Sequence, residues 1–246
     1  MRRVFVPEGG IEGDCVRLMG REAHYVRDVL RLGVGAHFSA VLPGGIERVA
    51  TVQRLAGQTV EAALGEPRDA QADPRVDVRV RPALVKARRL DLVVQKCTEL
   101  GATEVGPVLC ERGVARPDRD RVPHKVERWE KIAQEAARQC GRTWAPRVAE
   151  PVSFPLAVRE VADLGGTGLV LAPAGSGLVQ GALPALDDPE PISVFVGPEG
   201  GFTPDEVEVA RAAGLRIISL GGRILRAETA AIAACALLML ELGEFA

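Results

Sequence analysis

Residues 192–206 read ISVFVGPEGGFTPDE, and this stretch decides the fold class. Its first five residues, 192–196, form a short and continuous apolar-rich run, which is typical of a strand that is covered on both faces. Residues 197–201 follow as a glycine-rich turn, where a ligand meets backbone without a Cβ in the way. The stretch therefore predicts a buried strand that leads into a turn able to approach a ligand closely.

A helix is expected to begin directly after this turn. Thr203 is a natural N-cap, Pro204 suits the first helical position, and Glu206 completes a T-x-x-E capping box. Gly214 is the residue at which we expect the helix to end. A strand, a tight turn and a helix in succession are the repeating unit of an α/β domain with a mainly parallel sheet.

Two other apolar runs near the C-terminus show the same pattern of a strand followed by a glycine-rich loop. Leu169–Ala172 precedes Pro173–Gly177, and Leu215–Ser219 precedes Leu220–Arg226. Open α/β sheets bind ligands outside the carboxyl ends of their strands. If the three strands are neighbours, their loops converge on one pocket. The sequence supports neither a dinucleotide-binding G-x-G-x-x-G after a strand nor a P-loop.

The third loop leads into an Ala-rich segment, Ala227–Leu242, which predicts a helix. Its small side chains permit close packing, either within the core or across a homodimer interface. Glu228 near its start is explained by the helix dipole alone. Arg226, at the mouth of a glycine-rich pocket, has no such structural explanation and is therefore a candidate functional residue.

Strands and helices also alternate upstream of these motifs, from about residue 76 onward. Apolar spacing of 3 and 4 residues predicts the helices, and short apolar runs predict the strands. The predicted elements are a strand at Val76–Leu84, a helix at Arg88–Leu100 closed by Gly101, a strand at Val105–Leu109, a helix at Val122–Cys140 closed by Gly141, and a helix at Leu156–Leu164.

The N-terminal quarter of the chain has a different pattern and predicts a small β-rich unit of the kind that often binds RNA. The expected strands are Val4–Val6, Val16–Leu18, His37–Leu42, Val49–Leu55 and Thr59–Leu64, interrupted by one helix at Arg21–Leu30 with Val26, Val29 and Leu30 on one face. Residues 66–75 are polar, contain two prolines and predict a linker. We therefore divide the chain into an RNA-binding barrel at 1–68, a linker at 69–76 and an α/β domain at 77–246.

The charge is distributed unevenly along the chain, although the net charge is only −2. Residues 1–74 carry a net charge of −1, residues 75–150 carry +6, and residues 151–246 carry −7. The middle third is therefore the candidate for a phosphate-binding face. The alternative is that its basic side chains only solvate the exposed faces of helices.

Cysteine and histidine usage limits the chemistry that this chain performs. The five cysteines stand singly in apolar segments, which predicts buried, reduced thiols in a cytoplasmic protein. The three histidines are too few for a multi-histidine metal site, so we expect no metal. The longest apolar run, Ala230–Leu240, is shorter than the roughly 20 residues of a membrane span. No basic and apolar leader precedes Val4, so we expect a soluble protein that does not engage membranes.

Two late segments together resemble the cofactor motifs of the SPOUT methyltransferases. They are Gly197–Phe202 and Leu220–Ala230, and the whole chain resembles the RsmE family, the 16S ribosomal RNA uracil-N3 methyltransferases. Further segments that fit this family are His24 with Val29–Arg31, Gln95–Gly101, and Glu135-Ala136 with Gln139, Gly141 and Arg142.

The resemblance implies several properties that composition and spacing do not show. The C-terminal domain is expected to carry a deep trefoil knot with S-adenosylmethionine bound inside it, and the N-terminal barrel is expected to be PUA-like. The protein is expected to be a homodimer that acts on the 16S ribosomal RNA of the small ribosomal subunit. Gly222 departs mildly from the pattern, since a less glycine-rich loop is expected there.

The candidate site residues follow from these motifs. We expect Arg226 to stabilise negative charge on the target uracil or a nearby phosphate, and Glu199 and Glu228 to be candidate proton acceptors. The expected cofactor-binding residues are Leu171, Ala172, Pro173, Gly197, Pro198, Glu199, Gly200, Leu220, Gly221, Ile224, Leu225 and Arg226. The expected RNA-binding residues are Lys86, Arg88, Arg89, Arg138, Arg142, Arg27 and Arg31.

Two alternative functions remain open at this point. One is a SPOUT enzyme that modifies transfer RNA or a ribose hydroxyl. The other is a non-catalytic RNA-binding factor of ribosome assembly, in which the basic face binds RNA and the glycine loops are only structural.

Overall fold

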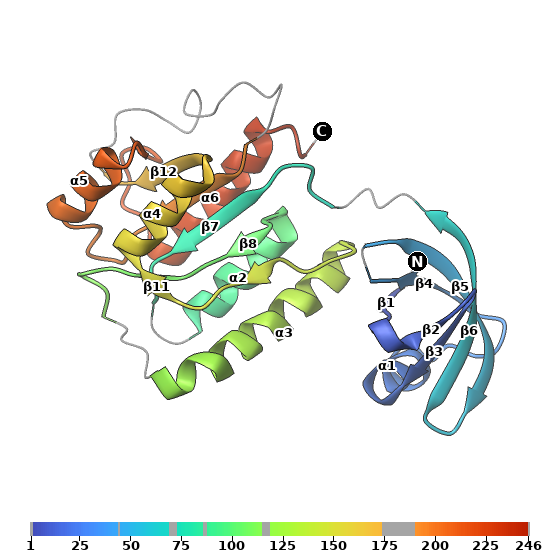
Figure 1. The fold of residues 1–246 in the computed structure, drawn as a ribbon. Helices are drawn as coiled ribbons and strands as arrows, with labels where there is room; N and C mark the ends of the chain where they lie inside the picture. Colours follow the sequence, from blue (N-terminus) through green and yellow to red (C-terminus); the bar gives the residue numbers. More distant parts are fainter. Residues whose placement is uncertain are drawn as a thin grey trace. The chain divides into compact units, whose positions relative to one another are not determined.

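The chain forms two compact units in the computed structural model. The structure describes residues 2–43, 45–68, 73–85, 88–114, 119–173 and 190–245. The first unit consists of Met1–Asp73 together with Ala137–Trp144, and the second consists of Pro74–Ala136 together with Ala145–Ala246. Figure 1 shows the elements of both units in chain order.

The first unit is built on a six-stranded sheet with the order β1-β4-β5-β6-β3-β2. Its strands are β1 (Arg3–Phe5), β2 (Ile11–Glu12), β3 (Cys15–Met19), β4 (His37–Val41), β5 (Glu47–Ala56) and β6 (Thr59–Arg68). β1 pairs with β4 in parallel, and the other neighbours are antiparallel. The five predicted strands are confirmed with shifted ends, and β2 is an addition. Residues 66–68, expected in the linker, belong to β6.

The predicted helix of this unit is present but changes its hydrogen-bonding pattern halfway. α1 (Gly20–His24) continues as one π-helical turn, η2 (Tyr25–Val29), which closes with the Leu30 N–H donating to the Tyr25 carbonyl at 2.8 Å. A π turn winds more residues per turn than an α-helix, so the next positions rotate away from the apolar face. Val26 is fully buried, whereas Val29, predicted on the same face, is 56% exposed.

The C-terminal end of the long helix α3 (Val122–Cys140) and the residues after it belong to the first unit. Arg142 is only 1% exposed and stacks over the Trp144 ring at 4.3 Å from its centroid. The Thr143 N–H donates to the Asp73 carboxylate at 2.8 Å. Arg138 lies over the Phe5 ring at 5.2 Å. These contacts fix residues 137–144 within the unit.

The second unit is built on a six-stranded parallel sheet with the order β10-β8-β7-β13-β12-β14. Its strands are β7 (Val78–Pro82), β8 (Glu104–Val105), β10 (Arg147–Val148), β12 (Thr167–Leu171), β13 (Ile192–Val196) and β14 (Arg216–Ile218). The predicted α/β class with a parallel sheet is confirmed. β13 is buried along its whole length, as the continuous apolar run predicts.

One predicted strand of this unit is divided in two. Val105–Leu109 was expected to be continuous, but β8 ends at Val105 and β9 (Val108–Leu109) pairs separately with β11 (Val152–Ser153). Pro107 between them has no N–H to donate to a neighbouring strand. The regular pairing is therefore interrupted here, and beyond Pro107 only a single parallel bridge joins Val108 to Ala83.

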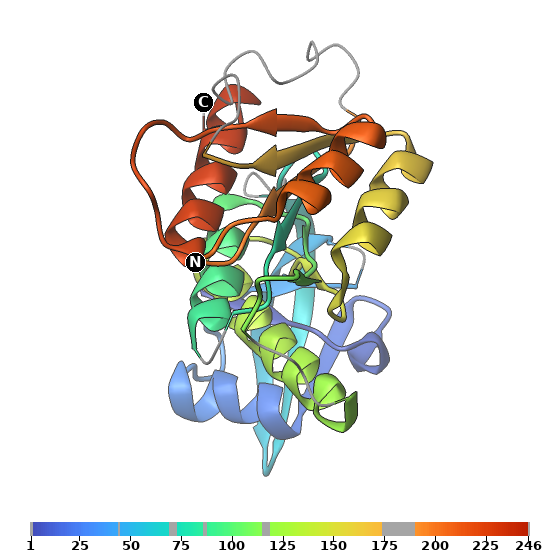
Figure 2. The same ribbon diagram turned by 90° about the vertical axis from the view of Figure 1, so that its left-hand side faces the viewer.

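Helices cover both faces of the parallel sheet, as Figure 2 shows. α2 (Arg89–Leu100) packs against α6 (Ala227–Glu241), and α6 packs against β7 and β13. α4 (Phe154–Leu164) lies on the opposite face and packs against β12 and α5 (Pro204–Ala212), which contacts β14. In α3, Trp129 is buried against α2 and donates from its indole nitrogen to Asp91 at 3.2 Å.

The thiols mostly follow the predicted pattern. Cys97, Cys110 and Cys235 are buried, Cys140 is half-buried, and all five cysteines are free. Cys15 is exposed, contrary to the prediction, because it occupies an outward position of the alternating strand β3. In the described part of the chain, no group of three or more candidate ligand side chains is arranged to hold a metal ion. No helix there combines the length and the apolar character that crossing a membrane requires.

Two helix C-caps of the second unit offer a matched test of the fold. Gly101 after α2 has φ 108°, and a Cβ there would lie 3.2 Å from Met239 Cε, whereas Gly165 after α4 has φ 71° and open space around it. We expect Gly165→Ala to lower the free energy of unfolding by about 1 kcal/mol, the cost of left-handed backbone. Gly101→Ala should lower it by about 2 kcal/mol or more, because its φ is outside the left-handed well and Met239 must move. Urea unfolding measures both, and equal losses would contradict this account.

Candidate functional site

A pocket of about 180 Å³ lies at the carboxyl ends of three neighbouring parallel strands. β12 pairs in parallel with both β13 and β14, so the loops after these strands leave the sheet at one edge. The predicted neighbourhood of the three strands is therefore confirmed. The pocket is lined by Leu171, Ala172, Pro173, Val196, Gly197, Pro198, Glu199, Gly201, Ser219, Leu220, Gly221, Gly222, Arg223, Ile224, Leu225, Ala227 and Ala230.

Most of the residues predicted to bind the cofactor are among these lining residues. Gly200 and Arg226 are the two predicted residues that do not line the pocket. Residues 174–177, the greater part of the first predicted loop, lie outside the described residues. Sequence reasoning missed Ala227 and Ala230, although their helical spacing places them on one face of α6.

The chemistry of the lining suits a ligand with a flat apolar part. Ile224 lines the pocket and is 90% exposed, so a large apolar side chain is available for contact. Gly221 has φ 101° and open space at its Cβ position, which leaves its backbone accessible. At Gly197, a Cβ would lie 3.2 Å from the Phe202 ring, so a larger residue there would require the ring to shift by a few tenths of an ångström.

The first turn of α5 follows the glycine loop at 197–201 and fixes its end by hydrogen bonds. Thr203 and Glu206 form the predicted capping box: the Glu206 N–H donates to Thr203 Oγ1 at 3.2 Å, and the Thr203 N–H donates to Glu206 Oε2 at 2.8 Å. The second carboxylate oxygen of Glu206 accepts the Glu111 N–H at 2.8 Å. Glu206 is 7% exposed, so its oxygens join α5 to the loop after β9 in a buried place.

Two neighbours of Glu111 complete this support. Arg112 donates from Nη1 to the Gly200 carbonyl at 2.9 Å and so holds the outer side of the glycine loop. Cys110 is buried beside Glu206, and burial, followed by the charge of Glu206, raises the pKa of its thiol to about 12. A thiol with that pKa stays protonated at neutral pH, so Cys110 is a packing residue and not a nucleophile.

An aromatic cluster lies beneath the loop. The Phe154 ring of α4 packs against the Phe202 ring with centroids 4.7 Å apart, and against the Phe195 ring of β13 edge-on at 5.4 Å. Phe202 is the residue whose ring limits Gly197. The loop therefore lies on a rigid apolar layer shared by β13 and α4.

The three candidate catalytic residues occupy different positions at the rim. Glu199 is half-exposed and forms an ion pair with Arg89 Nη1. Glu228 lies in the first turn of α6 with its side chain 12% exposed, and its Oε1 is 4.0 Å from Arg89 Nε. Its other oxygen, Oε2, is buried and has no hydrogen-bond partner among the residues that the structure describes. Arg226 is exposed and is the N-cap residue of α6.

The expected RNA-binding arginines are placed in several environments. Arg88 and Arg31 are exposed, and Arg31 has a positive φ of 54°. Arg27 donates to Asp28; the hydrogen bond with Arg27 lowers the pKa of Asp28 to about 2. Arg138 is half-buried over Phe5.

Another member of that set is not available as expected. Arg142 has only 1% of its surface exposed, because its guanidinium stacks on Trp144, and it has no surface to offer a phosphate. Lys86 lies outside the described residues.

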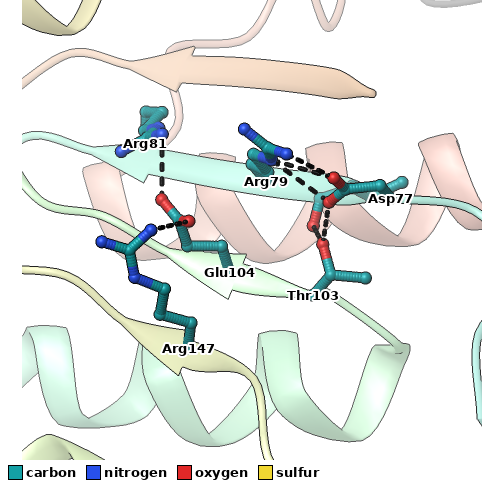
Figure 3. A network of polar contacts seen from close by, with 7 residues as sticks. Asp77, Arg79, Arg81, Thr103, Glu104 and Arg147 are labelled. Atoms are coloured by element: carbon teal, nitrogen blue, oxygen red, sulfur yellow. Dashed lines mark hydrogen bonds and ion pairs between the residues drawn. The ribbon is translucent and has the colours of Figure 1, made fainter. Parts of the chain in front are cut away.

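Part of the positive charge in the middle third is used inside the second unit. Figure 3 shows Arg81 and Arg147 on either side of Glu104, with N–O distances of 2.9 and 3.3 Å. Arg81 is 5% exposed, and burial lowers the pKa of its guanidinium. In the same network, hydrogen bonds from Arg79 and Thr103 lower the pKa of Asp77 below its ordinary value, although burial alone would raise it.

These side chains border a second cavity of about 500 Å³ at the β7 and β10 side of the sheet. Glu150, Glu160 and Asp163 also line it, so its rim is acidic, while its three arginines, Arg79, Arg81 and Arg147, are already paired with carboxylates. The +6 charge of residues 75–150 therefore does not all face the solvent.

Comparison with known proteins places this geometry among RNA-modifying enzymes. A family model for the RNA methyltransferase domain matches residues 72–239. The chain is 39% identical over 241 residues to ribosomal RNA small subunit methyltransferase E of Synechocystis sp., with 96% of this chain and 76% of that protein covered. It is 30% identical to the protein of the same name from Bacillus subtilis, with 89% and 87% covered.

A solved structure extends the comparison to the whole fold. Ribosomal RNA small subunit methyltransferase E from Neisseria gonorrhoeae, bound to S-adenosyl methionine, superimposes with a TM-score of 0.86. The two sequences are 27% identical, and the alignment covers 98% of each chain.

The capping box below the glycine loop gives a test of this support. Thr203→Ala removes the side-chain acceptor for the Glu206 N–H in a buried place, so we expect it to lower the free energy of unfolding by about 1 kcal/mol. Thr203→Ser keeps the hydroxyl and is the matched control, for which we expect a smaller loss. Urea unfolding followed by circular dichroism measures both. If the alanine and serine variants lose the same stability, the cap does not stabilise this turn.

Proposed function

This chain belongs to the ribosomal RNA small subunit methyltransferase E family of RNA methyltransferases, and on that premise we propose that it transfers a methyl group from S-adenosylmethionine to N3 of a uridine in 16S ribosomal RNA. The observation that carries the proposal is the single pocket formed by the loops after β12, β13 and β14. The S-adenosyl methionine bound to the Neisseria gonorrhoeae relative supports the same assignment. Because its proposed substrate is ribosomal RNA, the protein is proposed to work in the cytoplasm.

The residues of the pocket fit this cofactor. Apolar side chains such as Leu171, Leu220 and Ile224 offer walls for an adenine ring. Backbone groups of Ala172, Gly197 and Leu225 are positioned to hold the adenosine by hydrogen bonds, since Gly197 has no Cβ in the way. When bound, S-adenosylmethionine supplies a methyl group made electrophilic by its sulfonium. The protein has mainly to align the nucleophile with that methyl.

The rim residues supply the remaining chemistry. Uracil N3 carries a proton, so a nearby acceptor or a cation that stabilises the uracil anion accelerates its attack. Glu199 and Glu228 are the proposed proton acceptors, because their carboxylates lie at or beside the pocket. Arg226 is exposed at the start of α6, where it is able to hold the uracil oxygens or a flanking phosphate. N3 is on the pairing edge, so the target base must be unpaired or extruded.

The finer architecture is part of the same proposal. We assign residues 1–68 to a PUA-like barrel that binds RNA, residues 69–76 to a linker and residues 77–246 to the methyltransferase domain. A trefoil knot in that domain is proposed on the basis of the family to which the chain belongs. The protein is proposed to act as a homodimer, for which the exposed Leu237 and Leu240 of α6 are available.

The direct test is methylation of protein-free 16S ribosomal RNA and of small subunits that lack the modification. Nucleoside mass spectrometry should detect one new 3-methyluridine in at least one of the two substrates. A methylated ribose, or a product found only in transfer RNA, would replace the substrate assignment. Absence of specific S-adenosylmethionine binding by calorimetry would refute the enzyme itself.

Replacement of Arg226 tests its assigned role. Arg226→Ala removes the cation that stabilises developing negative charge, so we expect single-turnover methylation to fall by about 100-fold or more. Arg226 does not line the pocket, so the calorimetric Kd for S-adenosylmethionine should stay within about threefold. The control is Arg211→Ala, which removes an exposed arginine of α5 paired with Glu208. Normal methylation by the Arg226 variant would refute the role.

The salt dependence of RNA binding tests the basic residues. Arg88→Gln combined with Arg31→Gln removes two exposed charges, so the slope of log K against log salt should decrease by about 1 to 2. Arg211→Gln with Arg159→Gln removes two exposed charges on α5 and α4 and should leave the slope unchanged. Equal slopes for the wild type and the Arg88/Arg31 variant would exclude these residues from the RNA face.

A further inference from the structure

Arg89 joins two carboxylates that come from distant parts of the chain. It is the first residue of α2, Glu199 lies in the loop after β13, and Glu228 lies in the first turn of α6. Its Nη1 forms an ion pair with Glu199 Oε1, and its Nε lies 4.0 Å from Glu228 Oε1. One guanidinium thus bridges both proposed proton acceptors beside the cofactor pocket.

The local structure of α2 gives no reason for an arginine at this position. The N-terminus of a helix carries partial positive charge and disfavours a cation in the first turn. Within the described part of the chain, the side chain of the N-cap residue Arg88 makes no capping hydrogen bond at this end of α2. A residue that breaks a local rule in this way is expected to have a compensating tertiary role. The two carboxylates that approach Arg89 provide that compensation.

Glu228 depends on a nearby cation more than Glu199 does. Its side chain is 12% exposed, and among the described residues no donor forms a hydrogen bond with its buried Oε2. A carboxylate in such a place is costly to keep ionised unless it is paired. Arg89 is the cation found beside it in the described part of the chain. The same guanidinium also restrains Glu199, which lines the pocket.

We propose that Arg89 is a positioning residue of the methyltransferase, which orients Glu199 and Glu228 at the rim of the pocket and does not grip RNA phosphate. The proposal rests on the function proposed above and replaces the RNA-binding role expected for Arg89. A planar guanidinium holds its donors in a fixed fork that spans two carboxylates, whereas the ammonium of lysine is a compact charge with rotatable donors. Arg89→Lys should therefore restore only part of what Arg89→Gln loses.

The kinetic test separates positioning from phosphate binding. In Arg89→Gln, we expect single-turnover methylation at saturating RNA to fall by about 10- to 100-fold, because a misplaced catalytic group slows the reaction. The KM for RNA and the salt slope of RNA binding should remain as in the wild type. Arg89→Lys should recover part of the rate, and Arg211→Gln on α5 should match the wild type. An unchanged rate with a salt slope reduced by about 1 would overturn the proposal in favour of a phosphate contact.

A second cycle measures the coupling of Arg89 to Glu228 without any methylation. Arg89→Gln leaves the Glu228 carboxylate unpaired, so we expect Tm to fall by about 4 °C. Glu228→Gln added to Arg89→Gln removes the unpaired charge and should restore at least half of that loss. Strictly additive Tm changes would show that the two residues are independent and would overturn the proposal. Because this cycle needs neither RNA nor turnover, failure of the proposed function does not affect its result.

Discussion

The parallel pairing of β12 with both β13 and β14 is the constraint on which the pocket depends. It brings three loops that are far apart in sequence to one edge of the sheet. The pairing of β12 with β14 requires the two segments to approach closely. A Cβ at Gly168 in β12 would lie 2.3 Å from Leu215 Cγ, which is closer than any real contact. Glycine at this buried position therefore lets the segment leading into β14 pack beside β12. Gly168 itself does not line the pocket.

Several basic residues of the second unit are engaged in polar contacts within the protein, whereas others are exposed. Arg81 is buried against Glu104, Arg112 holds the carbonyl of Gly200, and Arg89 faces two carboxylates at the pocket. A count of charges along the sequence treats these arginines as equal to exposed ones such as Arg88. Only the positions of the acidic partners, which come from other elements, separate the two groups.

The sequence predicts most of what is local and less of what is tertiary. α3 and β13 have the predicted bounds, and the capping box at Thr203 forms as expected, because each depends on residues a few positions apart. The break at Pro107 and the π turn at Tyr25–Val29 were missed, although Pro107 is visible in the sequence.

The same distinction between local and tertiary features applies to the candidate site. The glycine loops are predictable because backbone freedom depends on the residue type, and glycines of the second and third loops, Gly197, Gly201, Gly221 and Gly222, line the pocket. The pairing of Arg89 with Glu199 and Glu228 joins three elements whose contact no spacing rule predicts.

The chain has two tryptophans, Trp129 packed against α2 in the second unit and Trp144 beneath Arg142 in the first. Each indole is thus an intrinsic spectroscopic reporter for one unit, and fluorine labelling of tryptophan alone gives separate signals by which the two units can be followed during ligand titration.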